Sequence, residues 1–231
     1  MAIMECKDLS KRFGGIQALD SVNLGIEPGR VVGLLGPNGS GKTTLIKLAN
    51  GLLTPTGGEI LIDGKAPGRE SKALVSYLSD KEYLPDWMTA KQLMDFFEDF
   101  YADFDRARAQ EMLVRLGIDE SMRIKQMSKG TREKVQLIMV MSRRALLYLL
   151  DEPIGGVDPA TRDYILETII RNYNPEAAVI ISTHLIADVE QVLDEVIFIR
   201  DGRIMLQSSV DAIREEQGVS VDQYFREVFK C

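Results

Sequence analysis

The chain has 231 residues, of which 45% are hydrophobic and 27% charged, a composition typical of a soluble globular protein. Its formal net charge of −7 provides no broad basic surface, so we expect no nucleic-acid partner. The sequence shows no apolar run of roughly 18 residues, no signal-peptide pattern and no zinc or disulfide spacing at Cys6 and Cys231, so we expect a cytoplasmic protein.

The first elements in the chain are two predicted strands, residues 3–9 and 22–26, where short apolar runs end in turn residues. Between them we expect an exposed loop, residues 11–15, that carries one aromatic side chain, Phe13. An aromatic ring on a loop can stack on a purine base. It can also fold back onto the core, and the residues alone leave both alternatives open.

The segment 36–44 fits G-x-x-x-x-G-K-S/T, the pattern of a phosphate-binding loop. The apolar run 31–35 predicts a strand that enters the loop, and the spacing in residues 43–50 predicts a helix that leaves it. Glycine allows the main chain to approach an anion, and the positive end of the helix dipole faces the phosphates. The phosphate-binding candidates are Gly36, Asn38, Gly39, Ser40, Gly41, Lys42, Thr43 and Thr44.

Two side chains of this loop have predicted roles of their own. Lys42 is expected to reach the β- and γ-phosphates, and the Thr43 hydroxyl to ligate Mg²⁺. The alternative is a glycine-rich turn with an exposed lysine. The order of strand, loop and helix favours the phosphate-binding loop.

The middle of the chain changes in composition. We expect a strand at 59–64, a polar connector at 65–72 and a strand at 74–78 that is followed by Asp80. Helical spacing between residues 89 and 143 then predicts a helical subdomain inserted into the sheet domain. Most aromatic side chains of this part are expected in its core.

Strands and helices alternate in the remainder of the chain. We expect strands at 145–150, 178–182 and 196–200, and helices at 160–171 and 185–192. This alternation predicts a largely parallel sheet in an α/β protein, whose ligands bind beyond the carboxyl ends of the strands. The amphipathic segment 208–231 is expected to be helical and to pack on the core.

Three polar residues follow the predicted strands at that edge. Asp151 can hold Mg²⁺, and Glu152 can orient or deprotonate the water that attacks a γ-phosphate. His184, the only histidine, can donate a hydrogen bond to the same phosphate. The alternatives are a solvated turn for the carboxylates and a passive role for the histidine.

These residues together resemble the nucleotide-binding subunit of ATP-binding-cassette (ABC) transporters over nearly the whole chain. The segment 36–44 looks like the Walker A motif, and residues 146–152 look like the Walker B strand with the catalytic glutamate. The resemblance implies that His184 is the switch histidine and that Asp158 lies in the loop through which two cassettes communicate. It also implies adenine contacts by Phe13 and Ala18.

Two positions depart from the family pattern. The signature motif, commonly L-S-G-G-Q, is Met-Ser-Lys-Gly-Thr at 127–131. We expect residues 127–130 to form a linker rather than part of a helix. Ser128 and Gly130 are kept, and Lys129 adds a cation where the partner's ATP is expected. Asp80 replaces a glutamine, and we expect it to coordinate Mg²⁺ directly or through water. The alternatives are an exposed loop aspartate and a lysine that projects to solvent.

The resemblance implies one ABC ATPase domain over 1–231: a P-loop NTPase core with a mostly parallel sheet, an antiparallel β subdomain and an inserted helical subdomain. The expected division is 1–80 with 145–207, then 81–144, then 208–231. Two cassettes, as a homodimer or heterodimer, would close over ATP and Mg²⁺ and power a separate transmembrane subunit, as an exporter, from the inner face of the cell membrane. The alternatives are a soluble cassette ATPase and an ATP-binding switch with little hydrolysis.

Overall fold

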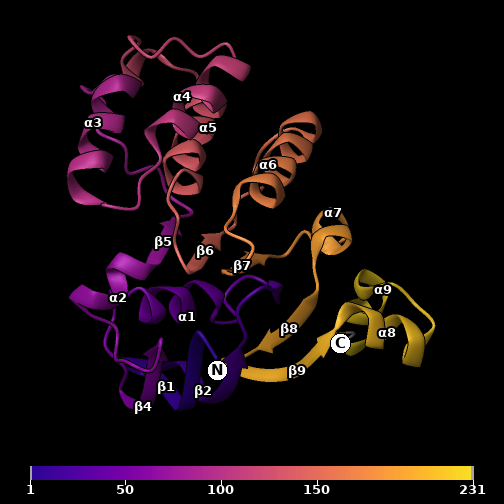
Figure 1. Ribbon diagram of the computed structural model, residues 1–231. Coiled ribbons are helices and arrows are strands. Elements are labelled where there is room, and N and C mark those ends of the chain that lie inside the picture. The colour runs from indigo at the N-terminus through magenta and orange to yellow at the C-terminus, as the bar shows by residue number, and fades with distance from the viewer. Residues whose placement is uncertain (1, 230–231) are drawn as a thin grey trace.

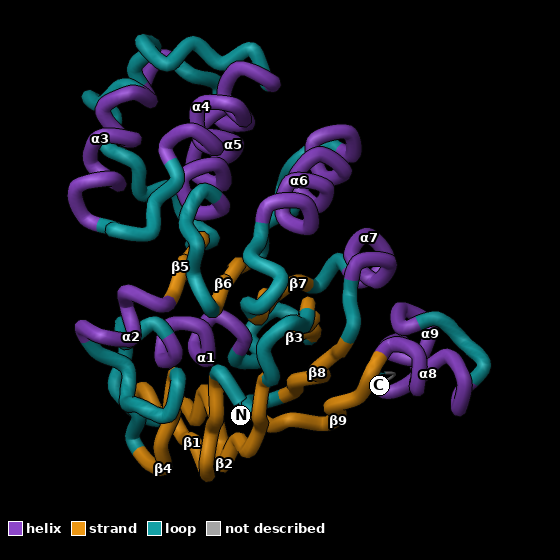
Figure 2. Tube along the Cα trace, in the orientation of Figure 1, coloured by secondary structure: helices purple, strands orange, loops and turns teal. Residues whose placement is uncertain are grey.

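The computed structural model describes residues 2–229 and consists of two sheets and a separate group of helices (Figures 1 and 2). The larger sheet has the strand order β5-β6-β7-β3-β8-β9, and all its neighbouring pairs are parallel except β8 with β9. The expected α/β fold with a largely parallel sheet is confirmed. Its strands are β3 (Val31–Leu35), β5 (Val75–Leu78), β6 (Leu147–Asp151), β7 (Ala178–Thr183), β8 (Glu195–Arg200) and β9 (Arg203–Ser209).

The smaller sheet is antiparallel, with the order β2-β1-β4, and is the expected antiparallel β subdomain. Its strands are β1 (Met4–Phe13), β2 (Ile16–Ile26) and β4 (Gly57–Ile62). The predicted loop at 11–15 was wrong: β1 continues to Phe13, and only Gly14 and Gly15 connect it to β2. Register shifts along this pair interrupt the alternation of apolar residues, which hid the full length of both strands.

The helices of the sheet part are α1 (Lys42–Ala49), α2 (Arg69–Leu74), α6 (Pro159–Asn172), α7 (Ile186–Val189), α8 (Val210–Gln217) and α9 (Val221–Val228). Two further expectations were wrong here. The polar connector at 65–72 contains the start of α2, which Gly68 precedes, and this helix is too short for an apolar stripe. The strand β9 was missed because its alternate residues are only half-buried.

Helices α3 (Ala90–Phe100), α4 (Arg106–Arg115) and α5 (Lys129–Met141) lie together at the top of Figure 1, away from the antiparallel sheet. A short 3₁₀ helix, η1 (Ile124–Gln126), precedes α5, and a second one, η2 (Glu190–Val192), follows α7. The linker expected up to residue 130 was wrong, because Ser128 caps a helix that already begins at Lys129.

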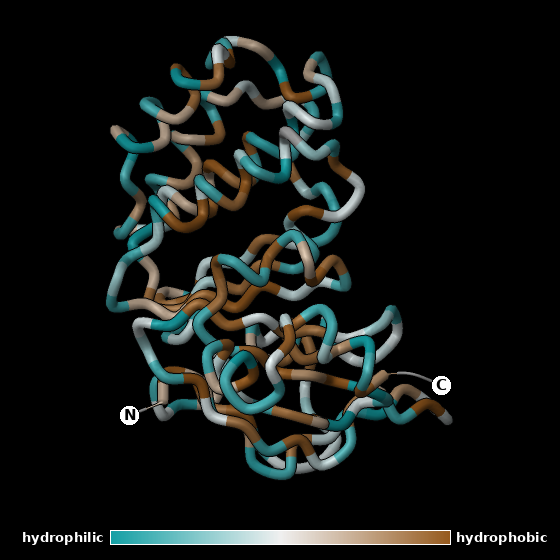
Figure 3. Tube along the Cα trace, turned by 90° about the vertical axis from the view of Figure 1, so that its right-hand side faces the viewer, coloured by the Kyte–Doolittle hydropathy of each residue, from teal (hydrophilic) through white to brown (hydrophobic). Residues whose placement is uncertain are grey.

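The apolar core is divided between these parts. Two clusters cover the two faces of the parallel sheet, and a third lies between α3, α4 and α5 around Leu93, Met112 and Ile138. Figure 3 shows hydrophobic residues gathered along the central strands and hydrophilic residues in the outer loops. Not all aromatic residues of the helical part are in its core, because Trp87 is 65% and Phe100 69% exposed.

Arg143, two residues after the end of α5, links the helical part to the sheet through buried polar contacts. Its guanidinium donates hydrogen bonds to the main-chain oxygens of Ala73 and Val75 and pairs with the carboxylate of Asp103 at 3.0 Å. The same group lies over the ring of Tyr101, 3.9 Å from its centroid. Among residues 2–229, no helix is both long and apolar enough to cross a membrane.

The C-terminal helices pack on the sheet as expected. Phe198 of β8 is fully buried, and its ring lies 5.2 Å from that of Phe225 and 6.1 Å from that of Tyr224, both on α9. These contacts attach the last helix to one face of the larger sheet, because the aromatic rings share one buried surface.

We predict that Phe198→Ala lowers the free energy of unfolding by about 3–5 kcal/mol, because it removes a large buried ring and leaves a cavity. Urea denaturation followed by circular dichroism measures the loss. The matched control is Phe100→Ala, whose ring is exposed, with an expected change below about 1 kcal/mol. Equal losses in the two variants would contradict the burial of Phe198.

Candidate functional site

The loop between β3 and α1 is built from glycines that no other residue can replace without displacement. A Cβ atom on Gly36 would lie 2.3 Å from the main-chain oxygen of Ile199, and one on Gly41 would lie 2.7 Å from that of Ala18. Gly41 also has φ 113°, and Gly39 at the exposed tip has φ 82°. The loop is therefore pressed against β8 and the start of β2.

The main-chain N–H groups of residues 41–44 have no acceptor within the described part of the chain. They belong to the first turn of α1, where intrahelical partners are missing and the dipole is positive. Asn38 is exposed at the tip of the loop, and Thr44 is half-buried in the first turn. The buried hydroxyl of Ser40 also lacks a partner among residues 2–229. The loop thus presents a set of unpaired donors, an arrangement that suits an anion.

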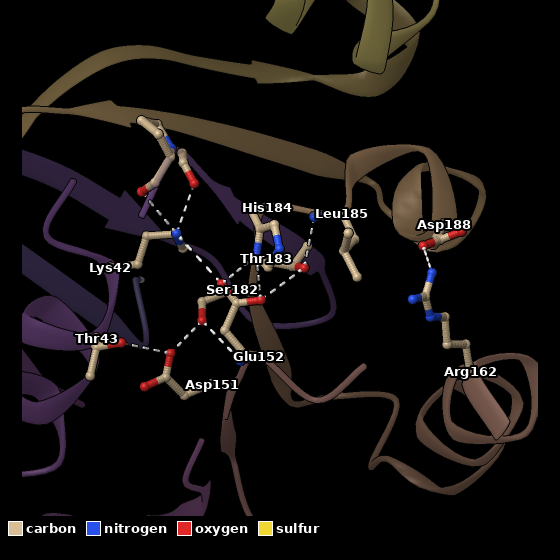
Figure 4. A network of polar contacts seen from close by, with 12 residues as sticks. Lys42, Thr43, Asp151, Glu152, Arg162, Ser182, Thr183, His184, Leu185 and Asp188 are labelled. Atoms are coloured by element: carbon tan, nitrogen blue, oxygen red, sulfur yellow. Dashed lines mark hydrogen bonds and ion pairs between the residues drawn. The ribbon is translucent and has the colours of Figure 1, made fainter. Parts of the chain in front are cut away.

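Lys42 points back into this loop rather than into solvent. Its ammonium donates to the main-chain oxygens of Gly36 at 2.7 Å and Pro37 at 3.2 Å, and lies 3.6 Å from the carboxylate of Glu152 (Figure 4). Burial lowers the pKa of Lys42, although the charges of Glu152 and Asp151 oppose this effect.

Asp151 is a fully buried member of the site. Its Oδ1 accepts hydrogen bonds from Ser182 Oγ at 2.6 Å and Thr43 Oγ1 at 3.1 Å. Its Oδ2 has no partner among the described residues, and burial raises the pKa of the carboxyl group. A carboxylate with a bare buried oxygen beside a hydroxyl is a ligand set that suits Mg²⁺, so these residues fit the expected cation.

Glu152 directly follows β6 in a strained main-chain conformation, with φ 50°. Its main-chain N–H donates to the Ser182 oxygen at 3.0 Å. Its carboxylate accepts from Thr183 Oγ1 at 3.2 Å and lies 3.1 Å from His184 Nδ1. Neighbouring contacts maintain this strained conformation of the main chain. It directs the side chain of Glu152 toward Lys42 (Figure 4).

Ser182 and Thr183 take part in the site although neither was among the predicted site residues. Both lie at the end of β7, which is hydrogen-bonded to β6 on one side and β3 on the other. Polar residues at the end of an otherwise apolar strand are the signal that indicates them, because strand ends of a parallel sheet meet at one edge.

Asp80 lies near this cluster but outside direct contact with it. Its carboxylate accepts a hydrogen bond from Ser79 Oγ at 3.3 Å, and its charge contributes to the raised pKa of Asp151. Asp80 and Glu152 line one groove of about 350 Å³, together with Lys129 at the start of α5. Direct coordination of a cation by Asp80 remains a prediction.

The signature residues form the start of α5. The Ser128 hydroxyl accepts a hydrogen bond from the Thr131 N–H at 3.2 Å and so caps the helix. Lys129 and Gly130 belong to the first turn, and the Lys129 ammonium is exposed, 3.6 Å from the Glu133 carboxylate. Ser128 and Lys129 at this helix terminus are exposed.

The remaining predicted residues lie around the phosphate loop or on the surface. Phe13 is 45% exposed at the end of β1, with the Lys11 ammonium 5.0 Å from its ring centroid. Ala18 is the residue whose main-chain oxygen adjoins Gly41. Asp158 caps α6, and its hydrogen bonds from Thr161 lower the pKa of its carboxyl group.

The family model described as "ABC transporter" matches residues 19–155 of this chain. The ABC transporter ATP-binding protein YtrB of Bacillus subtilis is 32% identical, over 93% of this chain and 74% of YtrB. The SkfA peptide export ATP-binding protein SkfE of the same organism is 31% identical, over 94% of this chain and 93% of SkfE.

Solved structures agree in fold. One described as the ATP-binding subunit of an ABC transporter has a TM-score of 0.88 and 29% identity, and covers 99% of this chain and 100% of its own. A dimeric ATP-binding cassette bound to ADP and Pi has a TM-score of 0.78 and 23% identity, over 89% and 98% of the two chains. The matched residues include the phosphate loop, the signature helix and the Asp151–Glu152 pair, and the chain belongs to the ABC transporter family as an ATP-binding cassette.

Proposed function

We propose that this protein binds ATP with Mg²⁺, hydrolyses it, and powers a separate membrane-spanning subunit by ATP-driven closure of two cassettes. The observation that carries the proposal is the meeting of Lys42, Asp151 and Glu152 beside the phosphate loop. Each of the three has a distinct use in phosphoryl transfer.

The phosphate groups of ATP bind the N–H groups of residues 41–44 and the ammonium of Lys42. The ammonium then donates hydrogen bonds to phosphate oxygens in place of the main-chain oxygens of the loop. The exposed ring of Phe13 stacks on adenine, and Ala18 packs nearby. Mg²⁺, when bound, neutralises phosphate charge and polarises the γ-phosphate. Thr43 and Asp151 would hold Mg²⁺, with Asp80 acting directly or through water.

Hydrolysis uses the carboxylate of Glu152 to orient the attacking water and accept its proton. The 3.1 Å contact with His184 and the hydrogen bond from Thr183 support this role, because they hold the carboxylate in one place. His184 also donates to the γ-phosphate, so it can distinguish ATP from ADP.

Two cassettes are needed because the signature residues lie at a surface of the chain. Ser128, Lys129 and Gly130 bind the γ-phosphate of ATP held by the other cassette, in a homodimer or heterodimer, and Asp158 contacts that cassette. The exposed start of α5 supports this arrangement, since its dipole and the Lys129 charge both attract phosphate.

The membrane-spanning subunit docks in a groove of about 410 Å³ between the sheet and the helical part. Its lining includes Leu52, Tyr77, Tyr83 and Phe96, which gives an apolar surface suited to a short segment of the partner. The protein would therefore act at the inner face of the cell membrane. Export as the direction of transport is supported by the likeness to SkfE, whose name refers to peptide export.

The first prediction tests hydrolysis. Glu152→Gln is expected to lower the kcat of ATP hydrolysis at least a hundredfold, because the amide cannot accept the proton of water. The variant should still bind ATP and form dimers with Mg-ATP that sedimentation detects. The matched control is Glu167→Gln, on the surface of α6, which should hydrolyse ATP at the wild-type rate.

Full turnover in Glu152→Gln would contradict the role of this carboxylate. Dimerisation with ATP but no turnover in the wild type would favour the ATP-binding switch. If the wild-type protein turns over ATP alone and never associates with membranes, the soluble ATPase becomes the better description.

A second prediction concerns the altered signature. In the Glu152→Gln background, Lys129→Ala should weaken ATP-dependent dimerisation at least fivefold, because it removes a cation that faces the partner's phosphates. Sedimentation at increasing ATP concentration measures the change. Lys125→Ala, a nearby exposed lysine on η1, is the control, and an equal effect of the two substitutions would exclude a specific role for Lys129.

A further inference from the structure

The segment 79–83, which carries Asp80, is held in place by side chains of α5. Within the described residues, its main chain makes no hydrogen bond to the main chain of any other residue. The segment leaves β5 and enters the helical part without pairing to a neighbouring strand. Its position therefore depends on the side chains that contact it.

Gln136 supplies three of these contacts. Its Nε2 donates to the main-chain oxygens of Ser79 at 3.3 Å and Lys81 at 3.4 Å, and its Oε1 accepts from the Tyr83 N–H at 3.4 Å. The residue is only 4% exposed, and the rest of this stretch of α5 is apolar. Burial of an amide side chain costs free energy unless the amide is hydrogen-bonded. The segment 79–83 supplies the hydrogen-bond partners of Gln136.

Arg132 adds a charged contact one turn earlier on the same helix face. Its Nε lies 2.9 Å and a terminal nitrogen 3.4 Å from the two carboxylate oxygens of Glu82. Residues four apart on a helix lie on one side of it, so Arg132 and Gln136 act on the segment together. The same helix begins with Lys129, and Asp80, Lys129 and Gln136 line one groove with Glu152.

We propose that Gln136, assisted by Arg132, fastens the Asp80 segment to the signature helix, so that the two approach the nucleotide as one unit. Gln136 is thus a positioning residue that acts through Asp80. A shift of α5 would move Asp80 relative to Asp151 and Glu152, which lie at the end of β6 and stay with the sheet. The effect on catalysis rests on the proposed function, whereas the attachment itself does not.

Hydrogen exchange on the full chain tests the attachment without any nucleotide. Gln136→Met keeps the length of the side chain and removes its three hydrogen bonds, so exchange of the Tyr83 amide is expected to become at least tenfold faster. Ser76→Ala is the matched control, because it removes one buried hydrogen bond from β5 to the Val140 oxygen of α5 and leaves 79–83 untouched. Unchanged exchange at Tyr83 in Gln136→Met would overturn the proposal.

If Gln136→Met does not fold, Arg132→Met provides the same comparison. It removes the contact with Glu82, and faster exchange of the Tyr83 amide, which donates to Gln136, is expected. Exchange at the wild-type rate in this variant would overturn the joint role of the two residues.

A double-mutant cycle tests whether Gln136 acts through Asp80. Gln136→Met should lower kcat about tenfold with the KM for ATP changed less than twofold, and it should have no further effect in the Asp80→Ala background. If the two substitutions lower kcat independently, so that their fold-changes multiply in the double variant, the action of Gln136 through Asp80 is overturned. Absence of turnover in the wild type would instead count against the proposed hydrolysis, while hydrogen exchange still decides the attachment.

Discussion

The central constraint on this molecule is the register of three adjacent parallel strands. β7 lies between β6 and β3, and its pairing places Ser182 opposite Asp151 and Thr183 opposite Leu35, the last residue before the phosphate loop. One strand end thus bridges the carboxylates and the loop. A one-residue slip would turn these side chains to the other face of the sheet and separate them.

Much of this arrangement is predictable because its signals are local. The phosphate loop, the apolar strands around it and the Asp151–Glu152 pair are short patterns in which neighbouring residues carry the information. The contacts of Ser182 and Gln136 could not be predicted in this way, since each joins segments more than 30 residues apart. The extents of β1 and β9 were missed for a related reason: cross-strand pairing stabilises them although their own alternation is weak.

The sheet and the helical part are joined by both apolar packing and hydrogen bonds. Leu137, Val140 and Met141 of α5 pack in the apolar cluster of the parallel sheet, and Arg143, Ser76 and Gln136 add hydrogen bonds between the two parts. Hydrogen bonds are directional and can be exchanged, while packed apolar side chains resist displacement. The apolar residues therefore hold the C-terminal half of α5 against the sheet, and the hydrogen bonds orient the segments beside it.

The exposed side chain of Trp87 gives this division a spectroscopic consequence. It is the only tryptophan in the sequence, and it lies in the helical part, where main-chain hydrogen bonds join the adjacent Asp86 and Met88 to η1. Emission excited at the red edge of the absorption band comes from this one indole ring. Tryptophan fluorescence of this protein therefore reports on the helical part alone. The sheet and its nucleotide site contain no tryptophan.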